Sequence, residues 1–170
     1  MKLNSQWTSH KLVLVAFLAT ILFVQEEALA FLPNIQLTVF LLVLYVKKTG
    51  WQMTSVIIGI HVFLDSLAMG SLNLVYTPFM LVGWLWIPLL LSTIFKRIKD
   101  VLPLALLGIL FALLYSWTFL IAQAWFYQVN LLAYLMADLP YETLLAISSF
   151  LSILWLYDPC AKVFDRMYHQ

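Results

Sequence analysis

The chain has 170 residues, of which 64% are hydrophobic and 10% charged, and its net charge is +1. Soluble domains carry roughly 25% charged residues, so this composition excludes an ordinary soluble protein. The length accommodates about six membrane spans of about 20 residues joined by short connections. We therefore expect one all-α integral membrane domain over residues 1–170, a bundle of six transmembrane helices with no nucleic-acid partner.

Proline, glycine and polar residues divide the apolar sequence into six predicted spans. These are residues 11–32, 36–46, 51–69, 77–95, 103–127 and 140–157. The second span covers only about half of a 30 Å hydrocarbon core at 1.5 Å per residue. The Pro33-Asn34 break before it should therefore lie within membrane depth, where irregular backbone must be enclosed by protein or line a cavity. A short amphipathic segment, residues 131–138, precedes the sixth span.

The first span has a second interpretation. Lys11, the apolar run 12–24 and the sequence Ala28-Leu29-Ala30 are also typical of a cleavable signal peptide. Cleavage would leave five spans and destroy the even topology that the basic residues indicate. We interpret the segment as a span.

The basic residues predict the orientation of the bundle. All nine lie before the first apolar stretch, in alternate connections or after the last span: Lys2, Lys11, Lys47, Lys48, Lys96, Arg97, Lys99, Lys162 and Arg166. Cytoplasmic segments of membrane proteins carry this excess of Lys and Arg. Both termini are therefore expected in the cytoplasm, with the connections near residues 33–36, 70–76 and 127–139 outside.

Five of the eight carboxylates fall at or near the predicted outer face, where no basic residue can pair with them: Glu26, Glu27, Asp65, Asp138 and Glu142. Polar groups at membrane depth are costly and often mark a ligand path, although a carboxylate at the interface can simply be solvated. Together with Asn34 and Gln36 at the break, they predict an outward-facing polar pocket.

Aromatic residues lie on the same side. Tyr76, Trp84 and Trp117 are candidates for stacking on a ligand. Trp and Tyr also form belts at the membrane interface in proteins of every function, and the belt is the alternative for each of them.

The sequence lacks the common enzyme motifs. It has no GxxxxGK[ST] phosphate loop and no His-Glu-x-x-His or Cys/His metal motif, and its single cysteine, Cys160, can form no disulfide within the chain. His61 and Asp65 share a helix face four residues apart, and could form a proton relay, a hydrolytic site or a structural contact. We expect no catalytic residue, bound metal or catalytic cofactor.

Three stretches resemble the substrate-binding S components of energy-coupling factor (ECF) transporters. They are EEALAFLPNIQ (residues 26–36), YTPFMLVGW (76–84) and YLMADLPYE (134–142). The likeness is loose but covers nearly the whole chain. It implies capture of a vitamin from outside a prokaryotic plasma membrane, in complex with a membrane scaffold (T) subunit and two cytoplasmic ATPases.

The family's Ala-x-x-x-Ala docking pattern has its nearest match at Ala16, Ala19 and Thr20, with Thr20 in place of the second alanine. Close packing within the subunit would use the same small residues.

No Lys or Arg lies on the predicted outer face. This absence bears on the choice of ligand, because Lys and Arg usually select carboxylates and phosphates. A neutral, amide-rich or cationic vitamin is favoured, with Glu26, Glu27, Asn34, Gln36, Asp65, Tyr76, Trp84, Trp117, Asp138 and Glu142 as candidate ligand-binding residues. The resemblance is strongest to the cobalamin-specific members; thiamine, its pyrimidine precursor and riboflavin also fit.

Two other functions stay open: a self-contained proton-coupled carrier using Glu26, Glu27, His61 and Asp65, and a membrane enzyme built on His61 and Asp65.

Overall fold

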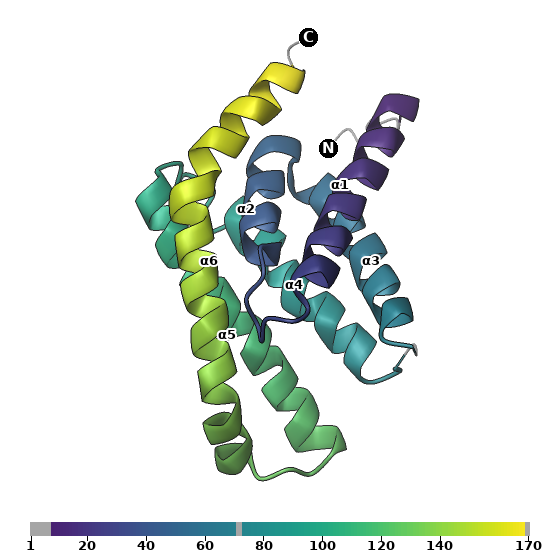
Figure 1. Ribbon diagram of the computed structural model, residues 1–170, viewed down its shortest axis with the longest axis vertical. Helices are drawn as coiled ribbons and strands as arrows, with labels where there is room; N and C mark the ends of the chain where they lie inside the picture. The colour runs from purple at the N-terminus through teal and green to yellow at the C-terminus, as the bar shows by residue number, and fades with distance from the viewer. Residues whose placement is uncertain (1–7, 71–72, 169–170) are drawn as a thin grey trace.

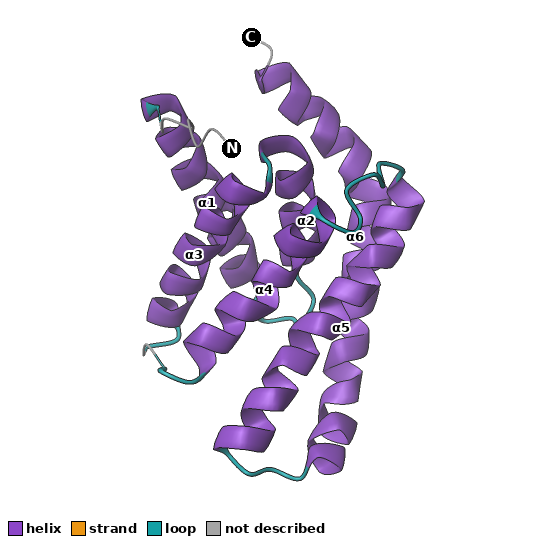
Figure 2. Cartoon of the chain, turned by 180° about the vertical axis from the view of Figure 1, so that it is seen from behind, coloured by secondary structure: helices purple, strands orange, loops and turns teal. Residues whose placement is uncertain are grey.

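A computed structural model describes residues 8–70 and 73–168 of the chain, and in this part it contains six helices and no strand (Figure 2). The helices are α1 (Ser9–Leu29), α2 (Thr38–Thr49), α3 (Trp51–Ala68), α4 (Tyr76–Ser92), α5 (Val101–Phe126) and α6 (Leu131–Tyr168). Four of them, α1, α3, α5 and α6, are long and apolar enough to cross a membrane, and α4 is a shorter apolar helix. The chain is thus all-helical, with the composition of a membrane protein.

Successive helices run in alternate directions along the long axis of the molecule (Figure 1). The start of α1, the α2–α3 turn, the α4–α5 connection and the end of α6 lie toward one end, which we call the basic end. It holds the described basic residues Lys11, Lys47, Lys48, Lys96, Arg97, Lys99, Lys162 and Arg166. The α3–α4 and α5–α6 connections lie toward the opposite end. The alternation expected from the sequence is therefore present, whereas the placement of a membrane around it stays a prediction.

The short helix α2 is the centre of the bundle. It packs against each of the other five helices, and eight of its 12 residues are buried. Residues 39–46 are apolar on every side, as expected of a helix that neighbours surround completely. At 1.5 Å per residue α2 rises about 18 Å. The irregular segment that precedes it, residues 30–37, lies near the middle of the long axis (Figure 1).

Helix α6 differs from its prediction. A separate segment 131–138 and a span beginning at Pro140 were expected, but one helix runs without a break from Leu131 to Tyr168, past both Pro140 and Pro159. A proline lacks a backbone donor and its ring crowds the carbonyl four residues earlier, but packing against a neighbouring helix can compensate for this cost. Here α6 packs along α5 and also contacts α2. Its 38 residues rise about 57 Å.

Gly83 of α4 provides a test of the packing between α4 and α5. A Cβ atom at this position would lie 2.8 Å from Cδ2 of Tyr115, too close for a rigid ring that is itself stacked on Trp84. We expect Gly83→Ala to lower the free energy of unfolding by about 1–3 kcal/mol, as overpacking does in other cores. Thermal unfolding of the purified protein in detergent measures the change.

Gly59 on α3 is the matched control, because a Cβ there would meet no atom within 4 Å. Gly59→Ala should leave stability unchanged or raise it by up to about 1 kcal/mol, since alanine is the better helix former. A loss of stability in Gly59→Ala equal to that in Gly83→Ala would contradict the contact between Gly83 and Tyr115.

Candidate functional site

Three ionisable side chains from α1 and α3 meet inside the bundle: Glu26, His61 and Asp65. His61 is fully buried, Asp65 is 3% exposed, and the two share the inward face of α3 one turn apart. Glu26 reaches them from the end of α1, where its Oε2 lies 3.1 Å from His61 Nε2. We call these three residues the acid–histidine cluster.

A polar network joins this cluster to the start of α2. Thr38 is the first residue of α2 and is buried. Its hydroxyl oxygen lies 3.1 Å from Glu26 Oε2 and 3.0 Å from Gln36 Oε1. The single hydroxyl hydrogen can be donated to only one of these two acceptors at a time. Gln25 Nε2 donates to the same hydroxyl at 2.8 Å, and Gln25 Oε1 accepts from the backbone N–H of Leu37 at 2.9 Å. Gln25 thereby connects the end of α1 to the backbone that leads into α2.

The acid–histidine cluster is only partly satisfied. Neither ring nitrogen of His61 has a hydrogen bond to another described residue, so the approach of Glu26 is an electrostatic contact without hydrogen-bond geometry. A buried polar group without a partner costs about 1–3 kcal/mol. An imidazole held this way, beside two carboxylates, can bind a ligand, a water molecule or a proton.

An aromatic pair lies beside the cluster. Trp84 of α4 is 1% exposed and stacks on Tyr115 of α5, with ring centroids 3.8 Å apart and an interplanar angle of 21°. The indole Nε1 has no hydrogen-bond partner in residues 8–70 and 73–168. Tyr115 lies within electrostatic range of Glu26 and Asp65. Trp84 is thus part of the buried core and not of an interfacial belt.

The other predicted residues of this region occupy different positions. Gln36 is half-buried in the polar network, whereas Glu27 and Asn34 are exposed, and Asn34 has a positive φ of 53°. Tyr76 accepts a hydrogen bond from Gln123 and stacks against Phe119 at 5.9 Å.

Asp138 and Glu142 form a second group, away from the acid–histidine cluster. Helix α6 does not pack against α1 or α3, so its carboxylates do not meet those of the cluster. Glu142 is buried, its Oε1 has no hydrogen-bond partner in the described part of the chain, and it lines a cavity of about 260 Å³ between α5 and α6. Asp138 is half-buried one turn earlier, and Trp117 of α5 is about half exposed. The residues predicted to share one pocket thus fall into two groups.

The predicted docking residues lie on both sides of α1. Ala16 and Thr20 are on its exposed face, where the Thr20 hydroxyl donates to the Ala16 carbonyl at 2.8 Å. Ala19 is 1% exposed and packs inside the bundle. A partner helix could therefore approach Ala16 and Thr20, but not Ala19.

Sequence reasoning missed Gln25, Thr38 and Tyr115. Gln25 interrupts an otherwise apolar span directly before Glu26 and Glu27, and this polar run was the signal that could have identified it. Thr38 and Tyr115 carry no such signal, because both residue types are common in apolar helices.

No three His, Cys, Asp or Glu side chains of residues 8–70 and 73–168 are placed to hold a metal ion. Comparisons with protein families, characterised proteins and solved structures found no match to this chain.

Proposed function

We propose that this chain is the substrate-capture subunit, or S component, of an ECF-type importer. It binds a vitamin from outside and passes it inward with a membrane scaffold subunit and two cytoplasmic ATPases. The observation that carries the proposal is the acid–histidine cluster: ionisable groups buried in an apolar bundle, beside the irregular segment that leads into a short central helix. Intramembrane ionisable groups are costly and typically serve a ligand or ion path.

The cluster favours a neutral or cationic ligand. Its carboxylates, Glu26 and Asp65, form no ion pair with a described Lys or Arg, which leaves their charge available to a cationic group or a hydrogen-bond donor of the ligand. Cobalamin is our first choice because of the sequence resemblance, with thiamine, its pyrimidine precursor and riboflavin as alternatives. Since His61 and Asp65 are enclosed, a ligand that contacts them requires the helices around them to move apart.

We further propose that the basic end faces the cytoplasm of a prokaryotic cell. A cysteine replacing Asn73, which is exposed in the α3–α4 connection, should react with a membrane-impermeant maleimide from outside intact cells once Cys160 is replaced by serine. A cysteine at Lys99 should react only after the cells are opened. Labelling of the Lys99 cysteine from outside, and of the Asn73 cysteine only in opened cells, would show that the basic end faces outside.

A proton-coupled carrier is the second candidate, and the 3.1 Å approach of Glu26 to His61 favours it. A carboxylate, an imidazole and a second carboxylate in one membrane-embedded cluster are the usual components of a proton path. This function needs no partner subunit.

Uptake measurements separate the two functions. Cells that express the chain alone, or with a scaffold subunit and ATPases, are given radiolabelled cobalamin, thiamine and riboflavin, with and without a protonophore. The S component predicts tight binding by the chain alone and sustained uptake only with the ATPases. Uptake by the chain alone that collapses with the proton gradient would establish the carrier instead.

A further inference from the structure

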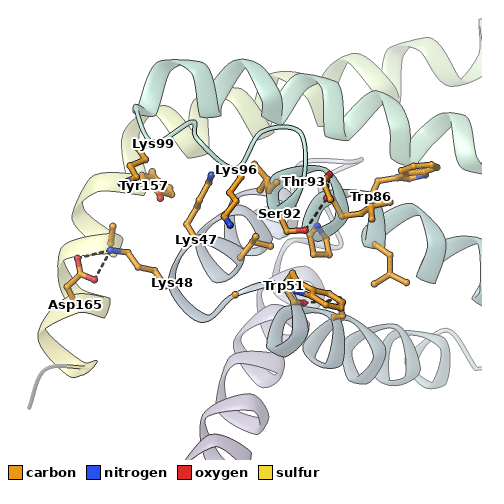
Figure 3. A pocket seen from close by; sticks show the side chains of 18 of the residues that line it. Lys47, Lys48, Trp51, Trp86, Ser92, Thr93, Lys96, Lys99, Tyr157 and Asp165 are labelled. Atoms are coloured by element: carbon orange, nitrogen blue, oxygen red, sulfur yellow. Dashed lines mark hydrogen bonds and ion pairs between the residues drawn. The ribbon is translucent and has the colours of Figure 1, made fainter. Parts of the chain in front are cut away.

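A large open cavity lies at the basic end and is lined by none of the residues of the acid–histidine cluster. A cavity of about 1210 Å³ is bounded by the end of α2, the start of α3, the second half of α4 and the last part of α6 (Figure 3). Pockets for small ligands are usually about 300–1,000 Å³. This cavity therefore has room for a larger molecule.

Positive charge exceeds negative charge in this cavity, because five lysines and two aspartates line it. Lys47 Nζ donates to the backbone carbonyls of Ile98 at 2.7 Å and Phe95 at 3.3 Å, and it extends into the same space as Lys96 (Figure 3). Among the described residues, no carboxylate lies within 4.0 Å of the ammonium group of Lys47, Lys96 or Lys99.

Lys48 is different, because it pairs with Asp165 at 2.6 Å (Figure 3). Four lining lysines, Lys47, Lys96, Lys99 and Lys162, have no ion pair with a described carboxylate, and they lie beside the Lys48–Asp165 pair and the carboxylate of Asp158.

The remainder of the lining is largely apolar. Trp51 and Trp86 lie on the side away from Asp165 (Figure 3), and Val82, Leu85 and Leu89 of α4 complete that wall. Trp51 and Leu89 are more than half exposed, so the apolar wall is open to its surroundings. A free phosphate would gain nothing from this wall, whereas an acyl chain would be buried against it.

We propose that this cavity binds an anionic phospholipid. Lys47, Lys96 and Lys99 contact the phosphate, and the acyl chains lie along Trp51, Trp86 and Leu89. Ammonium groups bind phosphate as point charges. Basic pockets between helices complement the anionic lipids of the cytoplasmic leaflet. The site is independent of the vitamin proposed above, because it lies at the other end of the bundle and uses other residues.

The test is a lipid titration of the purified full chain in detergent, followed by native mass spectrometry. The probes are phosphatidylglycerol, phosphatidylcholine and glycerol phosphate, the last as a free headgroup. We expect phosphatidylglycerol to bind most tightly. Lys96→Gln combined with Lys99→Gln should weaken it about thirtyfold, since each lysine near an anionic headgroup contributes roughly a fivefold gain in affinity.

The matched control is Lys11→Gln combined with Arg97→Gln, which removes the same charge from residues that do not line the cavity. It should change the affinity less than about threefold. Equal weakening in both double variants, or equal binding of phosphatidylcholine, would overturn the proposal. Glycerol phosphate that binds as tightly as the lipid would show a soluble-anion site in place of a lipid site.

Discussion

Asp65→Asn and Glu26→Gln are each expected to weaken ligand binding by about ten- to hundredfold. Both changes keep the shape of the side chain and remove its charge, so packing around His61 should be preserved. Losing a buried interaction of this kind costs about 1–3 kcal/mol, and 1.4 kcal/mol corresponds to a tenfold change in affinity. Titration of cobalamin, thiamine and riboflavin onto the purified variants measures the loss.

Glu27→Gln is the matched control for this experiment. Glu27 follows Glu26 directly but is exposed, so its substitution should leave affinity within about threefold of the unmodified protein. Asp138→Asn and Glu142→Gln test the second group of carboxylates. If these two variants lose affinity while Asp65→Asn and Glu26→Gln keep it, the ligand binds between α5 and α6 and not at the acid–histidine cluster.

Ala16→Trp and Thr20→Trp are expected to reduce ATP-dependent uptake by about tenfold or more while ligand binding persists. Both residues lie on the exposed face of α1, and small side chains at such positions let two membrane helices approach closely. A large indole would hold a scaffold helix away without disturbing the interior of the bundle. Uptake with the partner subunits, and binding by the chain alone, are measured for each variant.

Two neighbouring positions sharpen this test. Phe17→Trp replaces one bulky exposed side chain by another, so uptake should be retained. Ala19→Leu should damage folding and binding together, because Ala19 is buried. Equal loss of binding in Ala16→Trp and Thr20→Trp would mean that these residues serve packing within the subunit and not a partner.

The helical class and the order of the helices could be predicted because hydrophobicity is a local property of the sequence. A short second helix was correctly predicted from Pro33 and Lys47, but α2 begins at Thr38 and not at residue 36, and it continues past Lys47 to Thr49. The continuity of α6 could not be predicted in this way. The rules for proline treat a helix as isolated, and they predicted a boundary at Pro140. Helix α6 is instead packed along α5, and it continues past Pro140 without a break.

For the candidate site, local spacing predicted only part of the arrangement. The four-residue separation of His61 and Asp65 correctly placed both on one helix face. The approach of Glu26 to His61 depends on how α1 packs against α3, which no local pattern contains. The lysines at the basic end were interpreted for orientation alone, so the cavity that five of them line was missed.

The acid–histidine cluster has a consequence for biosynthesis. Glu26 is translated 35 residues before His61, so α1 is fully synthesised before the imidazole that will face its carboxylate. Until α3 follows, Thr38 and the backbone N–H of Leu37 are the groups of the described chain that bond the polar side chains at this end of α1. The pair of α1 and α2 therefore lacks part of its polar contacts until α3 packs against α1.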